Sequence, residues 1–209
     1  MVIYNKCDPK KAIHYCTLLA DQNFKEAQSL LASIYEKGEY VERDIEKSFH
    51  YYTLAANQNN KEAQYLLANI YEKGEYVERD IQKSIHYYTL AANQNHKNAQ
   101  YLLANIYEKG EYVECDIQKA FNYYSLASNQ NHSPSQTKLG IFYEYGTYVK
   151  RDISKAFYYY SLAANQNDEN AQYLLAKIYE KGEYVERDFQ KAIHYYKLSA
   201  DQNHFLAQY

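Results

Sequence analysis

The sequence has few of the features that are typical of secreted or membrane-spanning proteins. It has three cysteines in 209 residues, and Cys7, Cys16 and Cys115 do not follow the spacing of the rest of the chain. A disulfide framework would use an even number of cysteines at regular positions, so we expect free thiols in a reducing compartment and a cytoplasmic protein. No apolar run approaches the roughly 18 residues of a membrane span, and residues 1–11 lack a signal-peptide core. We therefore expect no membrane insertion.

The chain also lacks a strong charge of either sign and any recognisable catalytic arrangement. Its formal net charge is -3 at pH 7, which gives no electrostatic reason to expect nucleic acid as a partner. No glycine-rich phosphate loop is present. A catalytic site normally requires a unique arrangement of residues, and no nucleophile with a matching base stands outside the repeat pattern. The sequence therefore predicts no catalytic residue and no cofactor.

Four histidines share one position of the pattern, which superficially suggests a metal site. Helices packed side by side have axes roughly 8 to 10 Å apart, whereas zinc-nitrogen distances are about 2 Å. Equivalent histidines of neighbouring copies are therefore too far apart to bind one ion, and we expect exposed helix surface and no metal. The four residues are His14, His50, His86 and His194.

What the sequence does contain is a repeat of 36 residues. Its clearest copy begins at Ala63 and reads AQYLLANIYEKGEYVERDIQKSIHYYTLAANQN. Five glycines keep this period, and so do six aspartates. A fixed period in this range predicts a stack of supersecondary units, none of which can bury its apolar face alone. The periodic residues are Gly38, Gly74, Gly110, Gly146 and Gly182, and Asp8, Asp44, Asp80, Asp116, Asp152 and Asp188.

Each copy predicts two helices. In residues 60–73, apolar side chains follow the three-and-four spacing of a helix face, and Gly74 supplies the left-handed conformation that ends a helix. Asp80 is a suitable N-cap for a second helix, which closes before Asn95. Connections of about three to seven residues make neighbouring helices antiparallel.

The copies define the predicted organisation of the chain as one array. The first predicted helix, residues 9–20, corresponds to the second helix of a unit, so the chain enters the array half a repeat in. The predicted segments are a leader (1–7), a half repeat (8–26), five repeats (27–62, 63–98, 99–134, 135–170 and 171–206) and the truncated start of a further helix (207–209).

This pattern resembles the Sel1-like repeat, a module related to the tetratricopeptide repeat. The resemblance implies an all-α fold, a right-handed α/α superhelical solenoid of antiparallel helix pairs. It also implies a non-enzymatic scaffold or adaptor that binds other proteins. Two departures are a tyrosine, such as Tyr76, in place of the second turn glycine and Asn95 in place of the closing glycine. The matching residues are Ala63, Leu67, Ala68, Tyr71, Gly74, Val77, Asp80, Lys83, Ser84, Tyr87, Tyr88, Ala91 and Ala92.

The candidate site lies on a face of the first helices that the core does not use. If first helices line the concave side, as in related arrays, this face presents tyrosine, amide and charged groups in every copy. Such groups could grip an extended peptide or a partner helix, and the alternative is a solvated face without function. The candidate partner-binding residues are Tyr65, Asn69, Glu72, Tyr101, Asn105, Glu108, Tyr173 and Lys177.

Two other functions stay open at this stage. Some disulfide-rich relatives have been linked to β-lactams, so one alternative is a β-lactamase-like enzyme or small-molecule binder. The other is a purely structural spacer within a larger array. Neither end of the sequence shows a polar capping repeat, which such arrays usually need, so end-to-end self-association is a further hypothesis.

Overall fold

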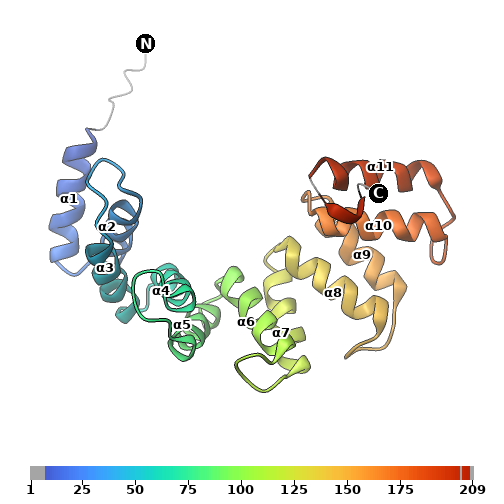
Figure 1. Cartoon of the computed structure of the whole chain (residues 1–209), viewed down its shortest axis with the longest axis horizontal. Coiled ribbons are helices and arrows are strands. Elements are labelled where there is room, and N and C mark those ends of the chain that lie inside the picture. The colour runs from blue at the N-terminus through green and yellow to red at the C-terminus, as the bar shows by residue number, and fades with distance from the viewer. Residues whose placement is uncertain (1–7, 203, 208–209) are drawn as a thin grey trace, which may run out of the picture. The chain divides into compact units, whose positions relative to one another are not determined.

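A computed structural model describes residues 8–202 and 204–207, and every regular element in these ranges is helical (Figure 1). The predicted leader, including Cys7, lies outside the described residues, as does most of segment 207–209. The first helices of the copies are α2 (Lys25–Lys37), α4 (Lys61–Lys73), α6 (Lys97–Lys109), α8 (Ser133–Tyr145) and α10 (Glu169–Lys181). The second helices are α1 (Pro9–Asp21), α3 (Ile45–Asn57), α5 (Ile81–Asn93), α7 (Ile117–Ser128), α9 (Ile153–Ala164) and α11 (Phe189–Asp201), and the 3-10 helix η1 (Phe205–Ala207) follows.

The ends of the helices are set by the residues that the sequence predicts. Asp80 caps α5, because its side chain accepts a hydrogen bond of 2.9 Å from the backbone N–H of Lys83. Gly74 ends α4 with a φ of 68°, and Asn95 follows α5 with a φ of 59°. The predicted start of α4 is one residue early, since Asn60 is the cap and not the first helical residue.

The helix pairs close over cores rich in alanine and leucine, and the second helices α3, α5, α7 and α9 each add one fully buried tyrosine. In α4 and α5, the side chains of Leu67, Tyr88 and Ala91 have no exposed surface, as the periodicity predicts. Gln64 is also fully buried, which the periodicity does not predict. Its amide nitrogen donates to the carbonyl of Ala56 at 3.1 Å, and its amide oxygen accepts from Gln94 at 2.7 Å. These bonds satisfy a polar side chain inside the core.

The same glutamine pair joins the two helices of every described copy. The amide nitrogen of the glutamine after each second helix donates to the amide oxygen of the buried glutamine on the preceding first helix. The donor and acceptor pairs are Gln58 and Gln28, Gln94 and Gln64, Gln130 and Gln100, Gln166 and Gln136, and Gln202 and Gln172, at 2.7 to 2.8 Å.

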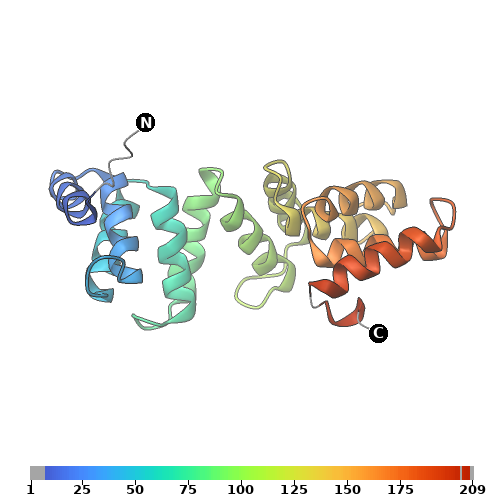
Figure 2. The same cartoon turned by 90° about the horizontal axis from the view of Figure 1, so that it is seen from above.

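The helices belong to two units, Met1–Ala99 and Gln100–Tyr209, with the boundary inside α6. In the first unit, α2 packs with α3 and α4 with α5, and α3 contacts α4. In the second unit α8 packs with α9 and α10 with α11, which lie side by side in Figure 2. The predicted fold class, an all-α repeat of packed helix pairs, is confirmed. Within the described residues, none of the helices has the length and apolar character needed to span a bilayer.

Candidate functional site

Several of the predicted site residues hold a buried tyrosine in place. The hydroxyl oxygen of Tyr88 lies 2.6 Å from Asn69 Oδ1 and 2.7 Å from Glu72 Oε2. In the next copy, the hydroxyl of Tyr124 makes the same two contacts with Asn105 and Glu108, each at 2.6 Å. These amides and carboxylates are half-buried and already have partners in their own repeat.

The surroundings of these tyrosines keep their hydroxyl groups protonated. Burial of the ring, followed by the hydrogen bond to Glu72, raises the pKa of Tyr88 above its usual value. Burial and the bond to Glu108 raise the pKa of Tyr124 in the same way. The carboxylates of this face therefore act as acceptors for neutral phenols, a structural role.

The predicted tyrosines of this face each pair with a histidine that follows the second helix of the same copy. Tyr65 stacks on His96 with ring centroids 4.4 Å apart, and Tyr173 stacks on His204 at 4.8 Å. The rings of Tyr101 and His132 are tilted, with centroids 5.0 Å apart. The sequence prediction did not include these histidines, although their position relative to the tyrosines also recurs with the period.

One copy in the second unit replaces this aromatic pair with two small polar residues. Thr137 stands at the tyrosine position of α8, and Asp168 stands at the histidine position before α10. The Thr137 hydroxyl donates to Asp168 Oδ1 at 3.0 Å, and the same oxygen accepts from the backbone N–H of Ala171 at 2.9 Å. Threonine is much smaller than tyrosine, so this replacement leaves space beside α8.

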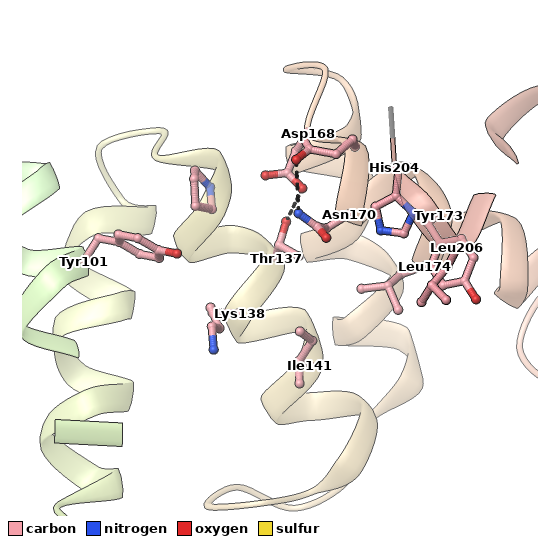
Figure 3. A pocket seen from close by; sticks show the side chains of 12 residues that line it. Tyr101, Thr137, Lys138, Ile141, Asp168, Asn170, Tyr173, Leu174, His204 and Leu206 are labelled. Atoms are coloured by element: carbon pink, nitrogen blue, oxygen red, sulfur yellow. Dashed lines mark hydrogen bonds between the residues drawn. The ribbon is translucent and has the colours of Figure 1, made fainter. Parts of the chain in front are cut away.

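A groove of about 580 Å³ occupies this part of the second unit. Figure 3 shows Thr137 between Tyr101 and Tyr173, with Lys138 and Ile141 farther along α8. Tyr101 and Tyr173 are thus the two predicted site residues that line the groove. The lining consists of Tyr101, Pro134, Thr137, Lys138, Ile141, Asp168, Glu169, Asn170, Tyr173, Leu174, His204 and Leu206.

The other predicted site residues lie elsewhere. Asn105, Glu108 and Lys177 are not among the lining residues of the groove, although Glu108 contacts one of them. Lys177 places its ammonium 5.7 Å from the centre of the Tyr173 ring. Tyr65, Asn69 and Glu72 belong to the first unit. The predicted face is therefore present on several first helices, and in the second unit part of it borders the groove.

The polar groups of the groove are mostly fixed by contacts within the protein. Lys138 replaces the leucine found in the other copies, and its Nζ lies 2.8 Å from Glu108 Oε2. Asn170 is exposed and Glu169 is half-buried, so both can reach a bound molecule. The Nδ1 atom of His204 is buried and has no hydrogen-bond partner among the described residues. The groove thus combines apolar walls with a few polar groups at its edges.

The described residues that line the groove do not form a metal site. Residues 8–202 and 204–207 contain no group of three or more histidine, cysteine, aspartate or glutamate side chains that could hold a metal ion. The four periodic histidines lie on exposed helix surface, as predicted. Cys16 is half-buried and Cys115 is exposed, and both are free thiols.

Comparison with known proteins agrees with this architecture. The Sel1 repeat family matches residues 5–24, 25–60, 61–96, 97–132, 133–168 and 170–204. A search among curated proteins gives no match. The structure is similar to that of a protective antigen of uropathogenic Escherichia coli with an SLR fold, at a TM-score of 0.88 and 30% sequence identity. That match covers 97% of this chain and 44% of the antigen, so this chain spans less than half of the antigen's length.

A Sel1 repeat protein from Oxalobacter formigenes is also similar in sequence and structure. It is 31% identical, with a TM-score of 0.81, and the match covers 88% of this chain and 76% of that protein. The six matched repeats account for nearly all of the described residues. The chain belongs to the Sel1 repeat family, whose members are generally scaffolds for protein interactions.

Proposed function

We propose that this chain is a non-enzymatic scaffold that holds a peptide segment of a partner protein in the groove beside α8. The observation that carries the proposal is the replacement of the tyrosine and histidine pair by Thr137 and Asp168, which leaves a hollow on the predicted binding face. Its volume of about 580 Å³ lies within the range of about 300 to 1,000 Å³ typical of ligand pockets.

The lining of the groove suits a peptide. Tyr101 and Tyr173 present aromatic rings at its two ends, and Ile141, Leu174 and Leu206 present aliphatic surface. These groups can cover the apolar side chains of a partner, where aromatic residues contribute much of the binding energy. The Asn170 amide and the Glu169 carboxylate can bond to peptide backbone groups. This arrangement supports binding of a short segment more than binding of a flat protein surface.

The polar groups of the groove do not support a proposal of catalysis. A nucleophile needs a neighbouring base that can take its proton. The Thr137 hydroxyl is directed at Asp168, whose carboxylate also caps α10 through the Ala171 N–H. Lys138 is paired with Glu108. Thr137, Asp168 and Lys138 therefore each have a structural partner, and we propose binding without turnover.

The test is peptide selection on the whole chain followed by measurement with matched variants. Peptides from a displayed random library are selected on the wild type, and their affinities are measured by fluorescence anisotropy. The double variant Thr137→Tyr, Asp168→His introduces the aromatic pair that three other copies contain and fills the groove. We expect this variant to bind the selected peptides at least tenfold more weakly.

The control makes the same chemical change in the first unit. Ser29 and Asn60 stand at the equivalent positions of the first full copy, so the variant Ser29→Tyr, Asn60→His adds the same two rings away from the groove. We expect it to bind the peptides like the wild type. Equal affinities in both double variants and the wild type, with all three folded by circular dichroism, would reject the groove as the binding site.

A further inference from the structure

Side chains at the turn between α8 and α9 line a second hollow in the second unit. It has a volume of about 430 Å³ and is separate from the groove, because the two share no lining residue. Three of its six lining side chains are cations and one is a carboxylate. The lining residues are Tyr143, Val149, Lys150, Arg151, Asp152 and Lys155.

The first unit contains the equivalent hollow with a different charge. It measures about 450 Å³ at the turn between α2 and α3, and its six lining residues are the counterparts of those in the second unit. Five of the six are identical in type. The exception is Glu42, which corresponds to Lys150, so the hollow of the first unit has two cations and two carboxylates. Glutamate also stands at this position in the remaining turns, as Glu78, Glu114 and Glu186.

The two hollows also differ in whether a carboxylate neutralises the lysine at their equivalent position. In the first unit Lys47 Nζ lies 2.9 Å from Asp44 Oδ2, and both groups face the same turn. Lys155 is the counterpart of Lys47, but among the described residues no carboxylate lies within 4.0 Å of its Nζ. Its ammonium lies 4.9 Å from the centre of the Tyr143 ring, which fixes its position without cancelling its charge.

The Arg151 side chain lines the same hollow and is anchored through its Nε atom. Its Nε donates to the carbonyl of Glu144 at 3.0 Å, which anchors the guanidinium to the end of α8. One terminal nitrogen is 3.7 Å from Glu183 Oε2, and both side chains are more than half exposed. An exposed pair at this distance contributes little, so an anion can compete for the guanidinium.

We propose that this hollow binds a phosphate-type anion through Lys150, Arg151 and Lys155. Lysine and arginine are the usual protein ligands for phosphate, and an anchored guanidinium loses little conformational freedom when it binds. The single carboxylate, Asp152, already accepts a bond from the backbone N–H of Lys155 at 3.0 Å. The phosphate group could be free or carried by a phosphorylated peptide, and the chemistry that recognises it is the same.

The test follows backbone amide signals by NMR while inorganic phosphate is added to the full chain at constant ionic strength and pH. We expect saturable shifts at residues 149–155 and much smaller shifts at the equivalent residues 41–47. Lys150→Glu restores the residue found in the other turns, so it should fold normally and bind phosphate at least tenfold more weakly. Equal responses from the wild type and K150E, or from the two turns of the wild type, would overturn the proposal.

A second set of titrations identifies the source of the phosphate group. A serine-phosphorylated peptide and its unphosphorylated form are compared with inorganic phosphate on the wild type. Tighter binding of the phosphopeptide than of either reference supports a phosphorylated partner, and affinity equal to that of inorganic phosphate supports a free anion. If neither phosphate-containing probe binds, the proposal is wrong.

The site can also be built in the first unit. The double variant Glu42→Lys, Asp44→Asn supplies the missing cation and removes the carboxylate that neutralises Lys47, while asparagine can still cap α3. We expect this variant to gain phosphate-dependent shifts at residues 41–47. Failure to gain them, in a folded variant, would show that the three cations are insufficient to bind the anion.

Discussion

One copy in the first unit begins with α4, and one copy in the second unit begins with α8. The two copies consist of equivalent helices, but they differ in the side chains at one contact. In the first, Tyr65 stacks on His96, and in the second, Thr137 donates a hydrogen bond to Asp168. Both pairs join a first helix to the residue that precedes the next first helix. The repeat therefore accepts a change of size and polarity when both members of the contact change together.

The regular copies therefore explain the fold, and the irregular copy carries the features on which our functional proposals rest. The copy at residues 133–168 differs from its neighbours at Thr137, at Lys138 and at Lys150. The first two line the groove and the third lines the basic hollow.

The largest expected effect is a loss of folding stability at alkaline pH, and both copies share it. Each copy buries a tyrosine, and burial favours the neutral form of its hydroxyl group. Burial of the ring and a bond to a glutamate raise the pKa of Tyr88 and of Tyr160. Below about pH 10 these hydroxyl groups are protonated in the folded and unfolded chains, so their contribution to stability is complete. Above that pH the unfolded chain ionises first, and stability falls by about 1.4 kcal/mol per pH unit for each such tyrosine.

This loss can be measured as the free energy of unfolding in urea between pH 9 and pH 11. The four fully buried tyrosines of this position are Tyr52, Tyr88, Tyr124 and Tyr160, so the combined slope should be several times that of one group. Replacing Tyr88 with phenylalanine should make the alkaline slope shallower. A free energy of unfolding that stays constant up to pH 11 would contradict the prediction.

A smaller effect on stability should differ between the two units, namely the loss caused by removing the N-cap residue of α10 or of α4. Asp168→Ala removes the cap of α10 and also leaves the buried Thr137 hydroxyl without its acceptor. Loss of a cap costs about 0.5 to 2 kcal/mol and a buried hydroxyl without an acceptor about 1 to 3 kcal/mol, so we expect a total of about 1.5 to 5 kcal/mol. The measurement is urea unfolding at pH 7.

Asn60→Ala is the matched control in the first unit, because Asn60 caps α4 through the Ala63 N–H. We expect a loss of about 1 kcal/mol from this variant, the typical value for a cap alone. Asp168→Asn should be milder than Asp168→Ala, since its amide oxygen can still accept both bonds. Equal losses from D168A and N60A would mean that the Thr137 bond contributes nothing.

The smallest effect concerns the partners of the buried tyrosines. The Tyr88 hydroxyl contacts Asn69 and Glu72, whereas Ile141 replaces the asparagine beside Tyr160, whose hydroxyl contacts Glu144 at 2.7 Å. The Tyr88 hydroxyl has one proton, which it can donate to Glu72, and the Asn69 side chain can add a second bond only by donating from its NH2 group to the hydroxyl oxygen. We expect Tyr88→Phe to destabilise the chain more than Tyr160→Phe, by about 0.5 to 1.5 kcal/mol, the usual contribution of one hydrogen bond. Urea unfolding of both variants measures the difference. An equal or larger loss from Y160F would indicate that Asn69 makes no contribution.

Local residues were sufficient to predict the helices and their ends. Gly74 ends α4 and Asp80 begins α5 because the left-handed glycine and the capping carboxylate act within one turn of the chain. Burial of Gln64 could not be predicted in this way. A glutamine in an amphipathic pattern indicates exposed surface, and its partner Gln94 lies 30 residues away.

The candidate site was predictable in part for the same reason. Periodicity placed Tyr101 and Tyr173 on one face of the first helices, and both line the groove. It did not predict that Thr137 bonds to Asp168, because that contact depends on the stagger between successive repeats. The departure of residues 137–141 from the pattern was visible in the sequence and was the available signal for the groove.

The buried glutamine pairs also determine which changes in length the chain can tolerate. Gln64 and Gln94 meet because a fixed number of residues separates them, and Gln28 and Gln58 meet for the same reason. Inserting one residue in an intervening turn would rotate or shift one amide away from the other and leave a buried polar group unpaired, at about 1 to 3 kcal/mol. Adding or deleting a complete copy leaves every amide opposite its counterpart. Length variation in this chain should therefore be tolerated in steps of 36 residues.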